Sequence, residues 1–336
     1  MAVGREARFW RLEGDLVRCE LCPHRCALSR EGQVGFCGAR FRRGGAMALR
    51  YYGLVTRPAL DPMEKKPLYH FHPGSYILSV GSPGCNMDCP FCQNWHLSRC
   101  GDALPWGLVE VDPRGLAELA LSCGSVGIAY TYSEPLVWVE FVLDCAGEAL
   151  SRGLKNVLVT NGMAHRPVVE ELCGLIQAAN VDLKVFDGDL YRGVLKGDLS
   201  AVLDSISSML EGGVHLEITH LVVPGFNDRE ELFSPMVDWI SSLSPRIPLH
   251  ISRYFPQRRW KEPPTEVSTL RRFYEIAREK LYYVYLGNLA SEEGAWTFCR
   301  GCGRALVKRD GYRVFDLQLA EGGRCRFCGV ENDFVL

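Results

Sequence analysis

The chain has almost no net charge and no long apolar run. Its 38 lysines and arginines nearly balance its 40 aspartates and glutamates, so the formal net charge is -2. This balance argues against nucleic acid or an anionic membrane as the main partner. The start, MAVGREARFWRLEGD, lacks the apolar core of a secretory signal, and no run reaches the roughly 18 apolar residues that a membrane span needs. We therefore expect a cytoplasmic protein with no membrane partner.

Cysteine, in contrast, is abundant. The chain has 15 cysteines, and most of them fall into three groups whose spacing is typical of metal ligands. A reducing compartment keeps such thiols available for metals, whereas a short secreted chain would use them for disulfides. We expect two of the scattered cysteines, Cys145 and Cys173, to be core residues because they lie in apolar helical patterns.

The central group is the run CNMDCPFC, in which Cys85, Cys89 and Cys92 follow an apolar stretch. Three thiolates on one loop can hold three corners of a [4Fe-4S] cluster, which usually takes four cysteines, so one iron stays open for another ligand. A structural zinc site needs four closed ligands, and this loop offers three. The ligand count therefore favours an iron-sulfur cluster with an open coordination site, and an open site on a metal usually means catalysis.

A longer set of motifs extends this reading. CxLCPHxC, EKKPLYHFHPGS, GCNMDCPFCQNW, TYSEP, TNG, DLKVF and LGN occur in this order from Cys19 to Asn288. In these motifs the chain resembles the AmmeMemoRadiSam-system radical S-adenosylmethionine (radical SAM) proteins, relatives of the pyruvate formate-lyase activating enzymes. The resemblance covers most of the chain, to about Cys328.

The resemblance implies a mechanism and its cofactors. S-adenosylmethionine would chelate the open iron, and an electron from the cluster would split it to give a 5'-deoxyadenosyl radical that abstracts a hydrogen atom. The electron would come from a donor such as flavodoxin or ferredoxin. The substrate would be a small molecule, a peptide or a protein; the glycine of a partner enzyme is the alternative that the activating enzymes suggest.

Short apolar runs alternate with helical stretches over 76–288, which predicts strand-helix units and a parallel sheet. The expected strands are 76–80, 126–132, 157–160, 181–185, 216–223, 249–255 and 282–286, with helices such as 135–152 and 267–281 between them. We expect an α/β fold, a partial (β/α) barrel of the radical SAM type, although a closed barrel or a doubly wound sheet has the same periodicity. The expected domains are 1–74, an N-terminal metal module; 75–290, the core; and 291–336, a C-terminal metal module.

Unusual polar residues fall at the ends of these strands, where parallel α/β folds gather their ligand groups. They include Glu134, Asn161, Asp182, Lys184 and His250. On a strand, Asp182 and Lys184 share one face, and an internal ion pair would explain them equally well. Glu134 before a proline could also be a carboxylate at a helix N-terminus.

The resemblance assigns roles to these residues. Asp182 would bind the ribose hydroxyls of S-adenosylmethionine, and Lys184 its methionyl end or the substrate. Tyr132, Ser133 and Glu134 stand where the family has Gly-Gly-Glu beside the methionyl amine, so this contact is less certain in geometry. A further group completes the expected pocket: Asn161, Phe91 beside adenine, His250 and, as a weaker candidate, Arg253.

The two outer cysteine groups predict small metal modules. Near the C-terminus, two C-x2-C pairs form a zinc-ribbon pattern, with a rubredoxin-like iron site as the alternative; they are Cys299, Cys302, Cys325 and Cys328. Near the N-terminus a C-x2-C-x3-C-x10-C group predicts zinc first and an auxiliary [4Fe-4S] cluster second; it comprises Cys19, Cys22, Cys26 and Cys37. His24 could replace one of these cysteines.

Segment 58–74 is polar and rich in groups capable of chemistry. It predicts either a solvated linker or a lid over the substrate, and we assign it no catalytic role. Cover of this kind favours a small-molecule or peptide substrate, because a closed site excludes water. A hypothesis from another class is a zinc-stapled binding protein, which would bind no S-adenosylmethionine.

Overall fold

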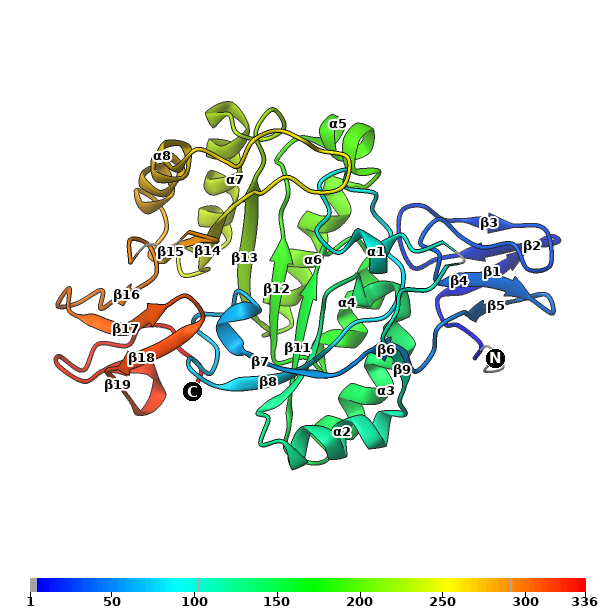
Figure 1. The fold of residues 1–336 in the computed structure, drawn as a ribbon, viewed down its shortest axis with the longest axis horizontal. Coiled ribbons are helices and arrows are strands. Elements are labelled where there is room, and N and C mark those ends of the chain that lie inside the picture. Colours follow the sequence, from blue (N-terminus) through cyan, green and yellow to red (C-terminus); the bar gives the residue numbers. More distant parts are fainter. Residues whose placement is uncertain (1–4, 102, 290–291) are drawn as a thin grey trace. The chain divides into compact units, whose positions relative to one another are not determined.

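The structure is a computed structural model that describes residues 5–101, 103–289 and 292–336 (Figure 1). The chain divides into two compact units. The first comprises residues 1–60, 77–179 and 188–214, and the second comprises residues 61–76, 180–187 and 215–336. The three expected domains, 1–74, 75–290 and 291–336, stay a prediction.

The first unit begins with small antiparallel elements. Strands β1 (Trp10–Glu13), β2 (Leu16–Cys19) and β3 (Ala27–Leu28) form one sheet, and β4 (Arg40–Arg43) pairs with β5 (Ala46–Leu49). Strand β6 (Leu54–Thr56) pairs with β9 (Leu108–Glu110). None of these short strands was predicted from the sequence, because runs of two to four residues carry too little periodicity.

Parallel strands form the centre of the first unit. Strand β10 (Gly127–Tyr130) lies between β8 (Tyr76–Val80) and β11 (Lys155–Thr160) and is parallel to both. Gly127 is required where β10 meets β11, because an added Cβ would lie 1.9 Å from the Lys155 carbonyl oxygen. Helices α2 (Pro113–Ser122) and α3 (Val139–Leu150) pack on β10, and α3 also packs on β11.

Helix starts in this unit follow ordinary capping chemistry. Asp112 caps α2 by accepting a hydrogen bond from the Gly115 amide, with Pro113 in the first turn. Asp198 caps α6 (Leu199–Glu211) in the same way through the Ala201 amide. The remaining helical elements of the unit are α1 (Trp95–Ser98), the 3-10 turn η2 (Pro135–Trp138), α4 (Arg166–Cys173), α5 (Gly188–Leu190) and the π-helical turn η3 (Tyr191–Leu195).

The second unit repeats the parallel arrangement. Strand β14 (Leu249–Arg253) lies between β13 (His215–Val222) and β15 (Val284–Gly287), parallel to both. Helix α8 (Val267–Arg278) packs on β14 and β15 and against α7 (Glu230–Leu243). The 3-10 turn η1 (Met63–Lys65) also belongs to this unit, while β7 (Ala59–Pro62) and β12 (Ala178–Asp182) lie at the boundaries of the two units along the chain.

The C-terminal part of the second unit is a small antiparallel module. Strand β17 (Ala305–Asp310) pairs with β16 (Thr297–Phe298) and β18 (Arg313–Leu317), and β19 (Leu319–Ala320) pairs with β20 (Arg324–Cys325) beside the turn η4 (Glu321–Gly323). Its core is a cluster of six buried residues: Cys299, Leu306, Val307, Leu319, Cys325 and Phe334. So small an apolar core suits a segment that is stabilised by a metal.

The predicted α/β class is confirmed, and alternating strands and helices are present in both units. The strand at 76–80 has the predicted bounds, whereas the predicted 181–185 strand ends earlier, at Asp182. The predicted helix 135–152 is divided into η2 and α3. In the described part of the chain, no helix has the length and apolar character that crossing a membrane requires.

Candidate functional site

The loop after β8 carries the three central cysteines. The Cys92 amide donates to the Cys89 carbonyl at 3.2 Å, which curls the loop, and the Met87 amide donates to the Cys85 sulfur at 3.4 Å. Burial, assisted by the nearby Glu134 carboxylate, raises the pKa of Cys85 well above that of a free thiol. A bound metal would offset this penalty, because a metal binds the thiolate and favours its formation.

Two asparagines fix the Cys85 end of this loop. Asn161, which directly follows β11, donates through Nδ2 to the Cys85 sulfur at 3.6 Å and to Asn86 Oδ1 at 2.9 Å. Asn86 is fully buried and donates to the Met163 carbonyl at 2.6 Å. The structure therefore brings the predicted Asn161 to the cysteine loop, and it adds Asn86, which sequence reasoning missed.

Glu134 is buried at the start of η2, and both of its oxygens accept hydrogen bonds. Oε1 accepts from the Leu136 amide at 3.0 Å and from Thr160 Oγ1 at 2.6 Å, while Oε2 accepts from the Asn161 amide at 2.8 Å. The carboxylate thus joins the end of β10 to the end of β11. The helix-terminus arrangement that the sequence offered as an alternative is present, and contact with S-adenosylmethionine stays a prediction.

The residues before Glu134 have an unusual backbone. Tyr132 has a φ of 67°, which lies in the left-handed region that glycine adopts readily. Ser133 donates through its hydroxyl to the Ser82 carbonyl, which holds this turn against the segment after β8. The backbone here has a glycine-like conformation although the family's glycine pair is absent. Phe91, predicted beside adenine, is 3% exposed.

The predicted residues of the second unit are arranged as follows. Lys184 Nζ lies 2.9 Å from Asp182 Oδ2, so the two residues form an ion pair at the end of β12. Their side chains are 16% and 38% exposed respectively, which leaves the pair accessible to a ligand. Asn227 donates to the Lys184 carbonyl at 2.6 Å and so fixes the backbone of this segment. The ribose and methionyl roles of the pair stay predictions.

His250 belongs to a buried polar network. Its Nε2 lies 2.6 Å from Glu217 Oε2, and the backbone amides of Tyr69 and His70 donate to the same carboxylate at 3.0 and 2.7 Å. Burial opposes ionisation of Glu217, but hydrogen bonds from His215 and His250 outweigh it and hold its pKa well below the usual range. A cofactor contact of His250 stays a prediction.

The segment 58–74 differs from the solvated linker that the sequence allowed. Glu64 and Lys66 are each 1% exposed, and His70 is fully buried. Lys66 Nζ forms an ion pair with Asp61 at 2.6 Å, and Arg309 donates to the Tyr69 carbonyl at 2.7 Å. From residue 61 onward the segment is therefore a packed part of the second unit, and Arg309, more than 200 residues further along the chain, contacts both the buried Glu64 and the Tyr69 carbonyl.

The C-terminal cysteine group is confirmed as a compact quartet. The ligand atoms of Cys299, Cys302, Cys325 and Cys328 all lie within 4.8 Å of one another. The sulfurs of Cys299 and Cys328 are 3.6 Å apart, and those of Cys302 and Cys325 are 3.7 Å apart. A tetrahedral zinc with Zn–S bonds of about 2.3 Å would separate its sulfurs by roughly 3.8 Å. The four thiols therefore fit one metal ion of that size.

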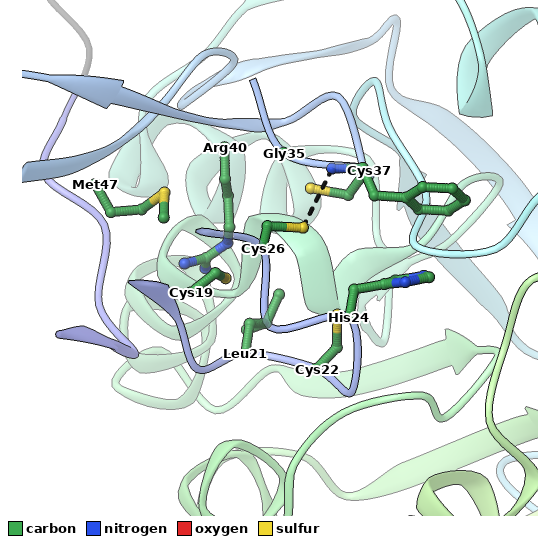
Figure 2. A pocket seen from close by; sticks show the side chains of 10 residues that line it. Cys19, Leu21, Cys22, His24, Cys26, Gly35, Cys37, Arg40 and Met47 are labelled. Atoms are coloured by element: carbon green, nitrogen blue, oxygen red, sulfur yellow. Dashed lines mark hydrogen bonds between the residues drawn. The ribbon is translucent and has the colours of Figure 1, made fainter. Parts of the chain in front are cut away.

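The N-terminal cysteine group lines a pocket within the first unit (Figure 2). Cys19 ends β2, Cys22 and Cys26 lie in the turn before β3, and Cys37 lies before β4. The buried side chain of Arg40 completes one wall. Burial raises the pKa of Cys19 to about 11, and the charge of Arg40 opposes that shift. The pocket has a cavity volume of about 10 Å³, and about 300 Å³ of empty space when the open solvent at its mouth is included.

Comparison with known proteins bears on the cysteine loop. A family model described as the radical SAM superfamily matches residues 79–234, which include Cys85, Cys89 and Cys92. The uncharacterized protein MJ0808 of Methanocaldococcus jannaschii is 36% identical over 338 residues, covering 99% of this chain and 100% of that protein. The GTP 3',8-cyclase of Brucella ovis is 28% identical over 184 residues, and the match covers 52% of this chain and about half, 50%, of the cyclase.

Solved structures give more distant likenesses. A domain of the pyruvate-formate lyase-activating enzyme from Bacteroides vulgatus aligns with a TM-score of 0.43 and 19% identity, covering 48% of this chain and 99% of that one. SuiB from Streptococcus suis, bound to S-adenosylmethionine, aligns with a TM-score of 0.49 and 15% identity, covering 63% of this chain and 52% of that one.

Proposed function

The chain belongs to the radical SAM superfamily, and from this premise we propose that Cys85, Cys89 and Cys92 hold a [4Fe-4S] cluster whose open iron binds S-adenosylmethionine. When bound, the cluster and the cofactor supply a one-electron cleavage that yields a hydrogen-abstracting radical. A low-potential donor such as flavodoxin or ferredoxin would provide the electron. The proposed substrate is a small molecule or a peptide.

The observation that carries this proposal is the cysteine loop itself. It offers three thiols, and Asn161 donates a hydrogen bond to the sulfur of Cys85. A hydrogen bond to a thiolate stabilises its charge and fixes its direction, as outer partners commonly do for metal ligands. The protein's part is to hold and orient the bound groups and to exclude water.

Two side chains of the second unit are proposed to bind the cofactor. Asp182 would accept hydrogen bonds from the ribose hydroxyls, and Lys184 would meet the carboxylate of the methionyl end or the substrate. Their ion pair at 2.9 Å supports this because each holds the other in a fixed position at the end of β12. Tyr132, Ser133 and Glu134 are proposed to shape the methionyl side through backbone groups. Phe91 and His250 are proposed to line the rest of the pocket.

The substrate preference rests on the departures from the activating enzymes. TYSEP replaces their Gly-Gly-Glu form, and the chain carries two additional cysteine modules. Such additions suit cover over a small substrate better than an opening for a protein loop. The alternative is an activating enzyme that acts on a glycine of a partner protein. Superfamily membership favours either enzyme over a zinc-stapled binding protein.

The Cys89→Ala variant tests the cluster. We expect the reduced variant to lose the electron paramagnetic resonance (EPR) signal that responds to S-adenosylmethionine, because two thiolates cannot hold the cube in place. Zinc content should stay unchanged. Cys123→Ala removes a cysteine outside the three groups and serves as the control. A variant that keeps the S-adenosylmethionine-sensitive signal would refute the assignment.

The Asp182→Asn variant tests the cofactor contact. Loss of a charge-assisted hydrogen bond costs about 1.5–3 kcal/mol, so affinity for S-adenosylmethionine should fall by roughly one to two decades. Calorimetry on the reconstituted protein measures this change. Asp189→Asn, in which the original carboxylate is 92% exposed, is the matched control. Equal affinities of wild type and Asp182→Asn would leave only the ion-pair role.

A mixing experiment separates the two enzyme hypotheses. Reduced protein and S-adenosylmethionine are added to a candidate partner enzyme, and the EPR spectrum is recorded. We expect no glycyl-radical doublet. A stoichiometric doublet would establish the activating-enzyme alternative.

A further inference from the structure

The N-terminal quartet is built to hold four thiolates. The Phe36 amide donates to the sulfur of Cys26 at 3.4 Å. Backbone amides also serve the other three thiols: that of Leu21 for Cys19, that of His24 for Cys22, and those of Ala39 and Arg40 for Cys37. Backbone amides around each sulfur fix its direction, as outer partners commonly do for metal ligands.

The sulfurs of the N-terminal quartet surround a space instead of forming the compact group seen at the C-terminus. Among the described residues, only the C-terminal quartet brings its ligand atoms within 4.8 Å of one another. Cys19, Cys22, Cys26 and Cys37 instead surround a pocket (Figure 2). A zinc ion draws four sulfurs to about 3.8 Å from one another, given Zn–S bonds of about 2.3 Å. A cube of four irons and four sulfides needs a wider set of thiolates, because the cube itself lies between them.

A buried ion pair forms one wall of the pocket. Arg40 lines the pocket and is 1% exposed. Both oxygens of Glu140 accept hydrogen bonds from its guanidinium at 2.6 and 2.7 Å, so the guanidinium is fixed beside the sulfurs. Glu140 offsets the charge of Arg40, and the pair presents its positive end to the pocket, which suits a centre that carries net negative charge.

Direct contacts join this quartet to the catalytic cysteine loop. The Cys85 amide donates to the Cys37 carbonyl at 3.1 Å, and His24 Nε2 donates to the Asn86 carbonyl at 2.8 Å. His24 therefore uses this nitrogen to bind the loop, not a metal. Gly84 makes the approach possible, because a Cβ there would lie 2.7 Å from the Cys37 oxygen.

Arg99 forms a clamp across the same contact. Its guanidinium donates to the Phe36 carbonyl at 2.8 Å and to the Met87 carbonyl at 2.6 Å. It also lies over the Phe36 ring, with 4.3 Å between the guanidinium carbon and the ring centroid. One side chain thus fixes the quartet's loop and the catalytic loop together.

From these observations we propose that Cys19, Cys22, Cys26 and Cys37 hold a second [4Fe-4S] cluster, in direct contact with the loop of Cys85, Cys89 and Cys92. This replaces zinc, the first expectation from the sequence, with its alternative. The inference concerns a different metal site from the one in the proposed function. It rests on that function only in counting this cluster as the second one in the chain.

The test uses the full chain, purified without oxygen and reconstituted with iron and sulfide. In a Cys85→Ala, Cys89→Ala, Cys92→Ala triple variant, we expect about four iron atoms per chain to remain, since four thiolates complete one cluster. The reduced variant should show an EPR signal that S-adenosylmethionine does not alter. A variant with no iron and two zinc ions per chain would overturn the inference.

A second variant guards against failure of the triple variant to fold. A Cys22→Ala, Cys26→Ala double variant leaves only two thiolates in the quartet, so it should lose about half of the iron and keep the S-adenosylmethionine-sensitive signal. The matched control, Cys123→Ala, should keep all of the iron. Full iron in the double variant would overturn the inference. If wild type lacks the S-adenosylmethionine-sensitive signal while the triple variant keeps its iron, the proposed function fails and the second cluster stands.

Discussion

The two outer cysteine groups have the same number of ligands but different surroundings. In the C-terminal quartet the sulfurs converge, with pairs 3.6 and 3.7 Å apart, and Cys302 and Cys328 are exposed. In the N-terminal quartet three cysteines are buried, the sulfurs surround a pocket, and a buried arginine lines it. Ligand count alone therefore does not determine the metal. The spacing of the sulfurs and the charged groups around them are the basis on which we propose different metals for the two groups.

The largest expected effect concerns the C-terminal quartet. In Cys325→Ala the ribbon of residues 297–336 should unfold locally, because metal binding in small modules supplies about 10 kcal/mol or more of folding free energy. Hydrogen exchange should show loss of protection in β17 and β18, and metal analysis should show the loss of one bound metal ion per chain, which we propose is zinc. Cys123→Ala is the control. Retained protection in β17 would mean that the apolar core of this module keeps it folded without a bound metal.

Removal of the buried Arg40 should lower the free energy of unfolding by less than the loss of the C-terminal metal does. The loss should affect the first unit as a whole instead of one small module. Arg40→Ala leaves Glu140 as an uncompensated buried charge, and breaking such a pair typically costs about 3–5 kcal/mol. Urea unfolding measures the loss of stability. Arg114→Ala removes one member of an exposed ion pair on α2, whose side chains are 74% and 54% exposed, and should change stability by less than about 1 kcal/mol. An equal loss of stability in Arg40→Ala and Arg114→Ala would show that the buried Arg40–Glu140 pair contributes no more than an exposed ion pair.

A smaller effect is expected at Glu134, next to the loop of Cys85, Cys89 and Cys92. Glu134→Gln replaces an oxygen acceptor with an amide donor where the Leu136 amide, Thr160 and the Asn161 amide all donate. Loss of hydrogen bonds to a charged group should lower the free energy of unfolding by about 1.5–3 kcal/mol. Urea unfolding of Glu118→Gln, at an exposed position, gives the baseline. An unchanged urea midpoint in Glu134→Gln would mean that these hydrogen bonds contribute little to stability and that other contacts hold this region.

The smallest effect per pH unit concerns a buried histidine beside the C-terminal module. His70 stacks on Phe334 of that module with ring centroids 4.1 Å apart, and burial lowers its pKa to about 3. Its folded pKa lies below the unfolded value of about 6.5, so protonation favours the unfolded state. The stability that neutral His70 provides is complete above pH ~6.5 and is lost as the pH falls toward its folded pKa.

The His70→Asn variant isolates this contribution. Between pH ~6.5 and ~4, wild type should lose about 1.4 kcal/mol per pH unit more than the variant. Urea unfolding at several pH values measures the slope of the unfolding free energy against pH for both proteins. Burial also lowers the pKa of His220, but this residue is present in both proteins, so its contribution cancels in the comparison. Parallel slopes would show that His70 does not titrate in this range.

The sequence predicts well where partners are close along the chain. The C-terminal quartet needs only two C-x2-C pairs joined by a short hairpin, so spacing alone indicated it. The strand before Cys85 has its predicted bounds because its apolar run is continuous. Helix α8 begins at the predicted residue, Val267, and ends within three residues of the predicted end.

Prediction fails where a partner is distant. Glu64 lies in a segment that reads as polar, and its burial depends on Arg309, 245 residues further along the chain. The pairing of Arg40 with Glu140 spans 100 residues, and neither has a local signal. Asn86 was missed because its role depends on hydrogen bonds with Asn161 and Met163, which follow strand β11 about 75 residues further along the chain. Sulfur spacing in the N-terminal quartet also depends on tertiary folding, so the sequence could not choose its metal.

The hydrogen bond between Cys85 and Cys37 has a consequence for the passage of electrons. It creates a continuous path from one ligand sulfur to the other, through Cβ, Cα and the amide of Cys85 and then through the carbonyl, Cα and Cβ of Cys37. Tunnelling is more efficient along bonded atoms than across empty space. In the proposed arrangement of two clusters, this path would carry the electron between them. A side chain at position 84 would clash with the Cys37 carbonyl oxygen and so break the path without changing any cysteine.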